Sequence, residues 1–291
     1  MASHFEFEAI GTHWKIDIFD RIPKEREHAL LAAIHARIAE FDKAYSRFRD
    51  DSLVSEMARK GGEYRLPDDA KQMLDLYKEL YDITDGLVTP LVGQVLVDAG
   101  YDAKYSLTPK SSIAPAKRWE DVLEYEFPML RLKEPALLDF GALGKGYLID
   151  IVAGIIRDSG VAGYLVDAGG DIAFRNSIEK PMIQVGLEDP QDMKKIVGAA
   201  RISGESICGS AGNRRAWNKF HHIMNPKTVE SPKHILGLWT VADTTLLADG
   251  LSTALFFVGP EKLAKYRFEF AILFSDRSAT QSKGFPGNFF V

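Results

Sequence analysis

Leu138-Asp139-Phe140-Gly141-Ala142-Leu143-Gly144-Lys145-Gly146-Tyr147 runs from an apolar segment through three glycines into a helical pattern. The pattern ends at Gly160, and Tyr164-Leu165-Val166 then reads as a strand that stops at Asp167-Ala168-Gly169-Gly170-Asp171. We therefore predict a strand from residue 137, a glycine turn, a helix and a second strand, which together make one β-α-β unit. The helix is predicted from the apolar spacing of Leu148, Ile151, Val152, Ile155 and Ile156.

The glycine turn is a candidate phosphate site. Glycines allow close backbone approach to a ligand, and a helix N-terminus offers unpaired N–H groups and a partial positive charge to an anion. Lys145 would add a full positive charge. The alternative interpretation is that Gly141 and Gly144 serve only close helix packing while Lys145 is solvated. The string is not a Walker A motif, which needs four residues between its glycines and Ser or Thr after the Lys.

The rest of the chain mixes helices and strands without regular alternation. Amphipathic helices are predicted at 24–45 and after a cap at Asp68 or Asp69, the second ending at Thr84. Strands are predicted at 182–187, 236–241 and 268–274, and around the alternating Trp14, Ile16 and Ile18. Residues 101–135, rich in Pro, Ser and Lys, read as loops and short strands and as a seam between two lobes. We predict an α+β fold with mixed sheets and packed helices.

Composition bounds the function classes. The 291 residues carry 41 acidic and 36 basic side chains, a net charge of −5, and no Lys/Arg block, so no nucleic-acid partner is expected. Cys208 is the single cysteine and is predicted to be a small core residue. No apolar run is long enough for a membrane span, and no basic segment precedes an apolar run at the start. The expected location is cytoplasmic, or exported if a leader precedes this sequence.

A second candidate site lies at Ala248-Asp249-Gly250-Leu251-Ser252-Thr253, inside an apolar helix. Asp249 and Thr253 stand at i and i+4, so their oxygens share one face. A buried carboxylate needs a partner, and a hard cation held by Asp, Thr and a backbone carbonyl would supply one. The alternatives are a polar stripe that faces water and a Thr that bonds back to a helix carbonyl.

A third cluster joins Ser206–Arg215 to Phe220-His221-His222-Ile223-Met224-Asn225-Pro226. Arginines can hold phosphate and a histidine can move protons. Adjacent histidines on a strand point to opposite faces, so we expect one inward and one outward and regard shared zinc as a poor fit. The sequence has no G-x-S-x-G elbow and no H-E-x-x-H, which argues against covalent hydrolase chemistry and zinc proteolysis.

Four separated strings occur in the same order as in the flavin transferases of the ApbE type, which this chain resembles. They are Ala9-Ile10-Gly11-Thr12, Asp139 to Tyr147 with Asp150, Leu165 to Asp171, and Ala248-Asp249 with Thr253. His222 to Thr228 is similar to the family's H-I-x-D-P-x-T, and Tyr45 to Ser52 resembles its segment after the first helix. The resemblance implies one T-fold-related domain over residues 1–291, in two closely packed lobes.

By the same resemblance, the family's metal ligands fall on the carbonyl of Ala142, the carboxylate of Asp249 and the hydroxyl of Thr253, a set that suits Mg²⁺. Asp249 and His222 are the predicted catalytic residues, with His222 near the phosphates. The implied FAD contacts are Ile10, Phe48, Leu87, Val88, Thr89 and Lys145. The chain departs from the family pattern at Phe48, Ala58, Thr89, Ala211 to Asn213, Asn225 and Val229. These departures remove polar contacts and leave the metal trio intact.

The implied activity is Mg²⁺-dependent transfer of FMN from FAD to a Ser or Thr hydroxyl of an acceptor flavoprotein, with release of AMP. The family's acceptor sequence is of the type Asp-x-x-Thr-Gly-Ala-Thr. Two alternatives stay open. FAD hydrolysis to FMN and AMP would use the same residues with water as the acceptor, and a flavin-binding protein without turnover would fit the departures from the family pattern.

Overall fold

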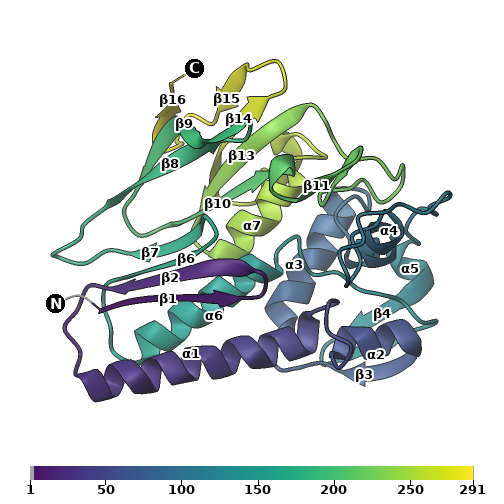
Figure 1. Ribbon diagram of the computed structural model, residues 1–291, viewed down its shortest axis with the longest axis horizontal. Helices are drawn as coiled ribbons and strands as arrows, with labels where there is room; N and C mark the ends of the chain where they lie inside the picture. The colour runs from purple at the N-terminus through teal and green to yellow at the C-terminus, as the bar shows by residue number, and fades with distance from the viewer. Residues whose placement is uncertain (1–2, 291) are drawn as a thin grey trace.

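The computed structural model describes residues 3–290, and an eight-stranded sheet forms its centre (Figure 1). The strand order is β1-β2-β6-β7-β10-β13-β14-β15, and every neighbouring pair is antiparallel. The strands are β1 (Ser3–Ala9), β2 (Thr12–Ile18), β6 (Tyr164–Ala168), β7 (Asp171–Arg175), β10 (Ser206–Ala211), β13 (Ile235–Ala242), β14 (Phe268–Phe274) and β15 (Ala279–Gln281). The predicted strands at 236–241 and 268–274 are confirmed, whereas β1 was not predicted.

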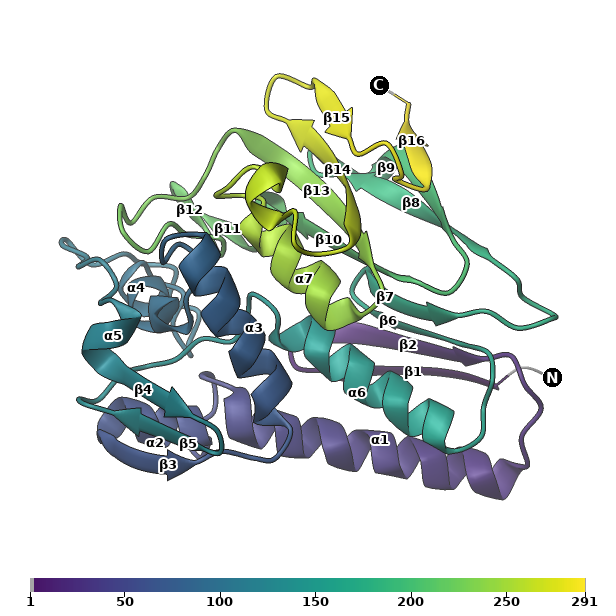
Figure 2. The same cartoon turned by 180° about the vertical axis from the view of Figure 1, so that it is seen from behind.

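Helices cover one face of this sheet (Figure 2). They are α1 (Lys24–Tyr45), α3 (Ala70–Ile83), α6 (Gly144–Asp158) and α7 (Thr245–Ala254). The apolar stripe of α1 and the inward side chains of β2 join one core, whose members include Leu30, Ile34, Ile38, Phe41, Trp14, Ile16 and Ile18. The predicted helix at 24–45 is confirmed, because its period and charge pattern are local properties of the sequence. Cys208 is buried, as predicted.

The N-terminus of α3 differs from the prediction in its chemistry. Asp69 occupies the cap position, but in the described chain its carboxylate makes no capping bond. It accepts a hydrogen bond from the Tyr45 hydroxyl at 2.9 Å and pairs with Arg37. Arg37 and Tyr45 on the neighbouring helix α1 therefore bind the Asp69 carboxylate, which is not free to cap α3.

A smaller sheet covers the opposite face of the central one. Its order is β16-β9-β8, from β16 (Gly287–Phe289), β9 (Asp192–Ile202) and β8 (Ile183–Asp189), and β8 contains most of the strand predicted at 182–187. The period of two along β13 explains how one strand serves both layers. Leu238 belongs to the core under the helices, whereas Trp239 and Val241 belong to the core between the two sheets.

The remaining elements gather at the far end of α1 (Figure 1). A sheet of order β3-β5-β4 is built from β3 (Gly62–Arg65), β5 (Met129–Leu132) and β4 (Leu123–Glu126). The helices here are α2 (Leu53–Arg59), η1 (Pro90–Val92), α4 (Gly93–Asp98) and α5 (Trp119–Val122). Elsewhere lie η2 (Gly212–Arg215), η3 (Pro260–Leu263) and the two-stranded ribbon β11 (Ala216–Trp217) with β12 (Phe220–His221). The predicted seam at 101–135 and the single domain over 1–291 stay predictions.

The predicted β-α-β unit is wrong. Residues 137–140 form no strand, and β6, which follows α6, pairs antiparallel with β2 and β7. The Asp139 N–H donates to the carbonyl of Pro90 in η1, and the N–H of the preceding Ala136 donates to that of Met57 in α2, so these donors go to helices and not to a neighbouring strand. Leu138 is fully buried, which is why its surroundings look like a strand in sequence. The predicted α+β class is nevertheless confirmed. Within residues 3–290, no helix has the length and apolar character needed to cross a membrane.

Candidate functional site

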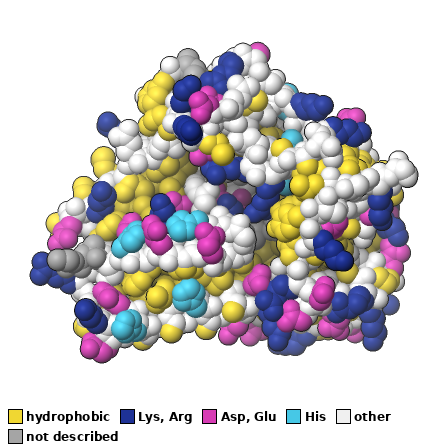
Figure 3. Space-filling model, in the orientation of Figure 1, with side chains coloured by type: hydrophobic (Ala, Val, Ile, Leu, Met, Phe, Trp, Pro, Cys, Tyr) yellow, Lys and Arg dark blue, Asp and Glu magenta, His cyan; other side chains and the backbone are white. Residues whose placement is uncertain are grey.

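A cavity of about 430 Å³ lies between the helix layer and the end of the central sheet. The space-filling view shows the molecule hollowed near its centre, with charged side chains at the hollow (Figure 3). Every residue that the sequence analysis singled out as a site residue lines this one cavity. They are Ile10, Phe48, Leu87, Val88, Thr89, Ala142, Lys145, His222, Asp249 and Thr253. The structure thus brings the ten together, and their individual roles stay predictions.

The three predicted metal ligands converge from the glycine turn and from α7. The Thr253 hydroxyl donates to the Ala142 carbonyl oxygen at 3.1 Å, and the Asp249 carboxylate accepts from the Gly146 N–H at 2.9 Å. Asp249 is 5% exposed, and its burial, reinforced by the charge of Asp171, raises its pKa to about 8. A bound cation would reverse that shift by stabilising the charged form. The oxygen set therefore fits a hard cation such as Mg²⁺.

The donor set holds a single carboxylate. Within the described chain, no group of three or more His, Cys, Asp and Glu side chains is placed to hold a metal ion. A site at Asp249 would draw its other protein ligands from a hydroxyl and a carbonyl, which leaves positions for water and for ligand oxygens. Nitrogen and sulfur ligands, which zinc prefers, are not part of this set.

Gly146 explains why the glycine turn and α7 stand so close. A Cβ at this position would lie 2.6 Å from the Asp249 Cβ and closer still to the Thr245 carbonyl oxygen. Asp150, one turn further along α6, accepts from the N–H groups of Thr245 at 2.9 Å and Leu246 at 2.7 Å. It thereby satisfies free donors at the N-terminus of α7. The sequence showed Asp150 only as part of a motif, because its partners lie 95 residues away or more.

Lys145 contacts Asp171, an acidic residue to which the sequence analysis assigned no role. Its ammonium forms an ion pair with Asp171, and its Nζ lies 3.4 Å from the Ala168 carbonyl oxygen. Asp171 is 2% exposed and accepts from the Gly209 N–H at 3.0 Å. Burial lowers the pKa of Lys145, but the charges of Asp171 and Asp249 outweigh it and raise the pKa above the usual value. The ammonium is a fixed positive charge in the cavity wall.

The two histidines do not divide into one inward and one outward side chain. Both are half-buried, because β12 ends at His221 and the alternation of a strand does not reach His222. His221 Nε2 donates to the Pro232 carbonyl oxygen at 2.8 Å. His222 lines the cavity, and its burial, with the charge of Arg215 in support, lowers its pKa to about 3. A neutral imidazole at physiological pH can accept a proton.

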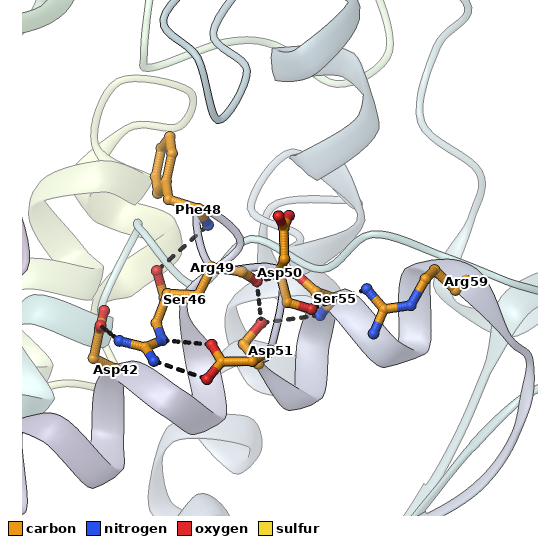
Figure 4. A network of polar contacts seen from close by, with 9 residues as sticks. Asp42, Ser46, Phe48, Arg49, Asp50, Asp51, Ser55 and Arg59 are labelled. Atoms are coloured by element: carbon orange, nitrogen blue, oxygen red, sulfur yellow. Dashed lines mark hydrogen bonds and ion pairs between the residues drawn. The ribbon is translucent and has the colours of Figure 1, made fainter.

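The loop that carries Phe48 is tied down on its outer side (Figure 4). Arg49 donates to both carboxylate oxygens of Asp51 at 2.9 Å and to Asp42 at 3.2 Å. The Ser55 hydroxyl donates to the Arg49 carbonyl, and the Phe48 N–H lies 3.4 Å from the Ser46 hydroxyl. Exposed ion pairs of this kind stabilise little individually. Together they link the turn between α1 and α2 at several points, and Phe48 lies on the cavity side.

Ile10 reaches the cavity from a strained turn. The hairpin of β1 and β2 turns at Ile10 and Gly11, whose φ angles are 46° and 72°. Two positive φ angles define a type I′ turn, for which Asn-Gly is the usual pair. A β-branched residue there is strained, and such strain concentrates at functional sites. Thr89 also lines the cavity, and its hydroxyl accepts from the Leu91 N–H at 3.2 Å and so begins η1.

Fold and cavity together define a class: an α+β protein with a cavity that is lined by the first residues of α6, a buried carboxylate and a neutral imidazole. A profile of the ApbE family matches residues 10–271. The chain therefore belongs to the ApbE family.

Named relatives and solved structures extend the comparison. The "FAD:protein FMN transferase" of Escherichia coli K12 is 30% identical over 278 residues, which is 88% of this chain and 78% of the relative. That of Klebsiella pneumoniae strain 342 is 26% identical over 283 residues, covering 90% and 80%. The ApbE protein of Thermotoga maritima shares the fold with a TM-score of 0.83 at 18% identity, over 97% of both chains. The flavin transferase ApbE of Vibrio cholerae shares the fold with a TM-score of 0.78 at 17% sequence identity, over 97% of this chain and 96% of that chain.

Proposed function

We propose that this protein transfers FMN from FAD to a Ser or Thr hydroxyl of an acceptor protein, in a Mg²⁺-dependent reaction that releases AMP. The observation that carries the proposal is the convergence of the Ala142 carbonyl, the Asp249 carboxylate and the Thr253 hydroxyl in one cavity with Lys145 and His222. The names of the relatives, FAD:protein FMN transferase, support the same activity.

The charged and polar cavity residues would bind the diphosphate of FAD, and the apolar ones would contact its rings. Ala142, Asp249 and Thr253 would hold Mg²⁺, which when bound would neutralise charge on the FAD diphosphate. Lys145, fixed by Asp171, adds positive charge beside the N-terminus of α6. Ile10 and Phe48 offer apolar surface to the rings of the dinucleotide. Positioning of this kind is the main demand of phosphoryl-transfer chemistry.

The reaction needs one proton acceptor. The oxygen of the acceptor hydroxyl would form a bond to the FMN-side phosphorus, and the bond from that phosphorus to the bridging oxygen would break, so that AMP leaves with the electron pair. The hydroxyl proton would pass to the unprotonated ring nitrogen of His222. His222 is neutral at physiological pH, so a ring nitrogen is free to accept the proton. Its low pKa makes it a weak base in the ligand-free cavity, and the negative charge of a bound diphosphate would raise that pKa toward the useful range.

The test is a chromatographic assay of FAD with the purified protein and a peptide of the type Asp-x-x-Thr-Gly-Ala-Thr, with Mg²⁺ or with EDTA. We expect AMP and peptide-bound FMN in equal amounts, only with Mg²⁺. A peptide with both threonines replaced by valine is the control and should stay unmodified. If the products are AMP and free FMN only, the activity is hydrolysis and not transfer. If FAD stays intact under all conditions, the protein binds flavin without turnover.

A further inference from the structure

Unsatisfied buried polar atoms gather at the cavity. Among residues 3–290, four buried side-chain nitrogen or oxygen atoms have no hydrogen-bond partner: Arg47 Nη2, Tyr101 OH, His221 Nδ1 and His222 Nδ1. Arg47, Tyr101 and His222 line the cavity. Buried polar groups in native proteins are almost always paired, and an unpaired one is costly. A ligand that supplies the missing partners would account for the cluster.

Arg47 is held on several sides, which leaves one nitrogen free. Its side chain is 2% exposed and forms an ion pair with Asp139 through Nε. Its Nη1 donates to the Tyr101 carbonyl oxygen at 2.7 Å, and its guanidinium carbon lies 4.2 Å from the centre of the Phe48 ring and 4.8 Å from that of Tyr101. These contacts fix the plane of the guanidinium. Its remaining Nη2 can only donate a hydrogen bond, so it requires an acceptor atom.

Tyr101 is equally fixed. Its ring packs on Trp217 with 5.4 Å between ring centres, and burial raises the pKa of its hydroxyl to about 12, so the hydroxyl stays protonated. The ring centres of Phe48 and Tyr105 lie 5.4 and 5.5 Å from the ring centre of Tyr101. Tyr105 is 53% exposed and stacks on Phe48 within 10° of parallel. Tyr105 is therefore the ring that would move aside for a ligand.

We propose that Arg47 Nη2 and the Tyr101 hydroxyl form a hydrogen-bonding pair that recognises the polar edge of a ring system in the dinucleotide substrate. The inference rests on the proposed function and assigns these two residues to ring specificity. An acceptor atom beside a donor occurs on the imide edge of the flavin and on the amino-pyrimidine edge of adenine. The pair binds one of these edges, and separate ligands identify which.

Tyr101→Phe tests the pair cleanly, because the hydroxyl that it removes has no protein partner. We expect an unchanged or higher free energy of unfolding, together with a dissociation constant for FAD raised about threefold to tenfold. Tyr64→Phe is the matched control, since the Tyr64 hydroxyl donates to the Lys60 carbonyl oxygen at 2.6 Å and lies outside the cavity. It should lower stability and leave FAD binding unchanged.

The measurements are urea unfolding and calorimetric titration with FAD, FMN and ADP. Weaker binding of FMN with unchanged ADP assigns the pair to the flavin, and the reverse assigns it to adenine. Arg47→Lys keeps the charge beside Asp139 and should weaken the same ligand. Unchanged affinity of Tyr101→Phe for all three ligands overturns the inference, even if the wild-type protein transfers flavin. A wild-type protein that binds the ligands without transfer, and loses affinity in Tyr101→Phe, sustains the inference while the proposed function fails.

Discussion

Gly146→Ala should lower both stability and activity, although alanine is the better helix former. Within α6, exchanging Gly for Ala favours the helix by about 1 kcal/mol. At residue 146, however, the new Cβ would meet the Asp249 Cβ at 2.6 Å and the backbone carbonyl of Thr245. Overpacking costs about 1–3 kcal/mol, and contact with groups that cannot rotate away places Gly146→Ala at the upper end of that range. Subtracting the gain of about 1 kcal/mol in helix propensity leaves an expected net loss of about 2 kcal/mol.

The same displacement would disturb the site. The Gly146 N–H donates to Asp249, and the Thr253 hydroxyl bonds to Ala142, so separating α6 from α7 moves two of the three oxygen donors. A misplacement of roughly 1 Å at a reacting centre can cost about 100-fold in rate. We therefore expect kcat/KM for FAD to fall about 100-fold in Gly146→Ala.

Gly154→Ala provides the matched control on the same helix. The nearest atom to its new Cβ is Arg157 Nη2 at 3.8 Å, an ordinary contact. We expect stabilisation of about 0.5–1 kcal/mol and unchanged turnover. Urea unfolding and FAD turnover would be measured for both variants. If Gly146→Ala matched the wild-type protein in stability and rate, the close approach of α6 and α7 would not position the site as argued.

Three further predictions concern the cavity. Asp249→Ala should reduce FAD turnover by at least about 1,000-fold and His222→Ala by about 100-fold, measured as initial rates of AMP release; equal, mild effects would contradict the assigned roles. EDTA should stop AMP release and excess Mg²⁺ should restore it, whereas turnover that persists after exhaustive chelation would show that the reaction needs no metal ion. His222 has a folded-state pKa of about 3 against an ordinary 6.5, so its contribution to stability is complete above pH 6.5 and is lost as pH falls toward 3. When the pH is lowered from 6.5 to 5, the free energy of unfolding measured with urea should fall about 1–2 kcal/mol less for His222→Gln than for the wild-type protein. Equal decreases in the two proteins would refute the burial of a neutral imidazole.

Local patterns in the sequence predicted local structure well. The helix at 24–45 follows from apolar residues four apart, and the shared face of Asp249 and Thr253 follows from helical geometry. Strand pairing depends on residues far apart in the sequence, and for this reason the prediction of a strand at 137–140 was wrong. The apolar character of this segment reflects its burial and not pairing with another strand. The division of His221 and His222 into one inward and one outward side chain was misjudged for a related reason, since β12 ends at His221 and is too short for the alternation to hold.

Contacts between distant residues could not be predicted from spacing alone. The Thr253 hydroxyl meets the Ala142 carbonyl across 111 residues, and only the family resemblance had joined them. The ion pair of Lys145 with Asp171 and that of Arg47 with Asp139 have no signal in the sequence beyond the residue types. Each depends on how the sheet and helices pack, which is a property of the whole chain.

Flavin transfer is tested by the mass of the denatured acceptor peptide after incubation with FAD, Mg²⁺ and the wild-type protein. We expect the peptide to gain the mass of one FMN residue, located by fragmentation on a threonine hydroxyl, and to gain nothing when Asp249→Ala replaces the wild-type protein. A peptide of unchanged mass, alongside FAD consumed to free FMN and AMP, would contradict transfer and leave hydrolysis as the activity of this cavity.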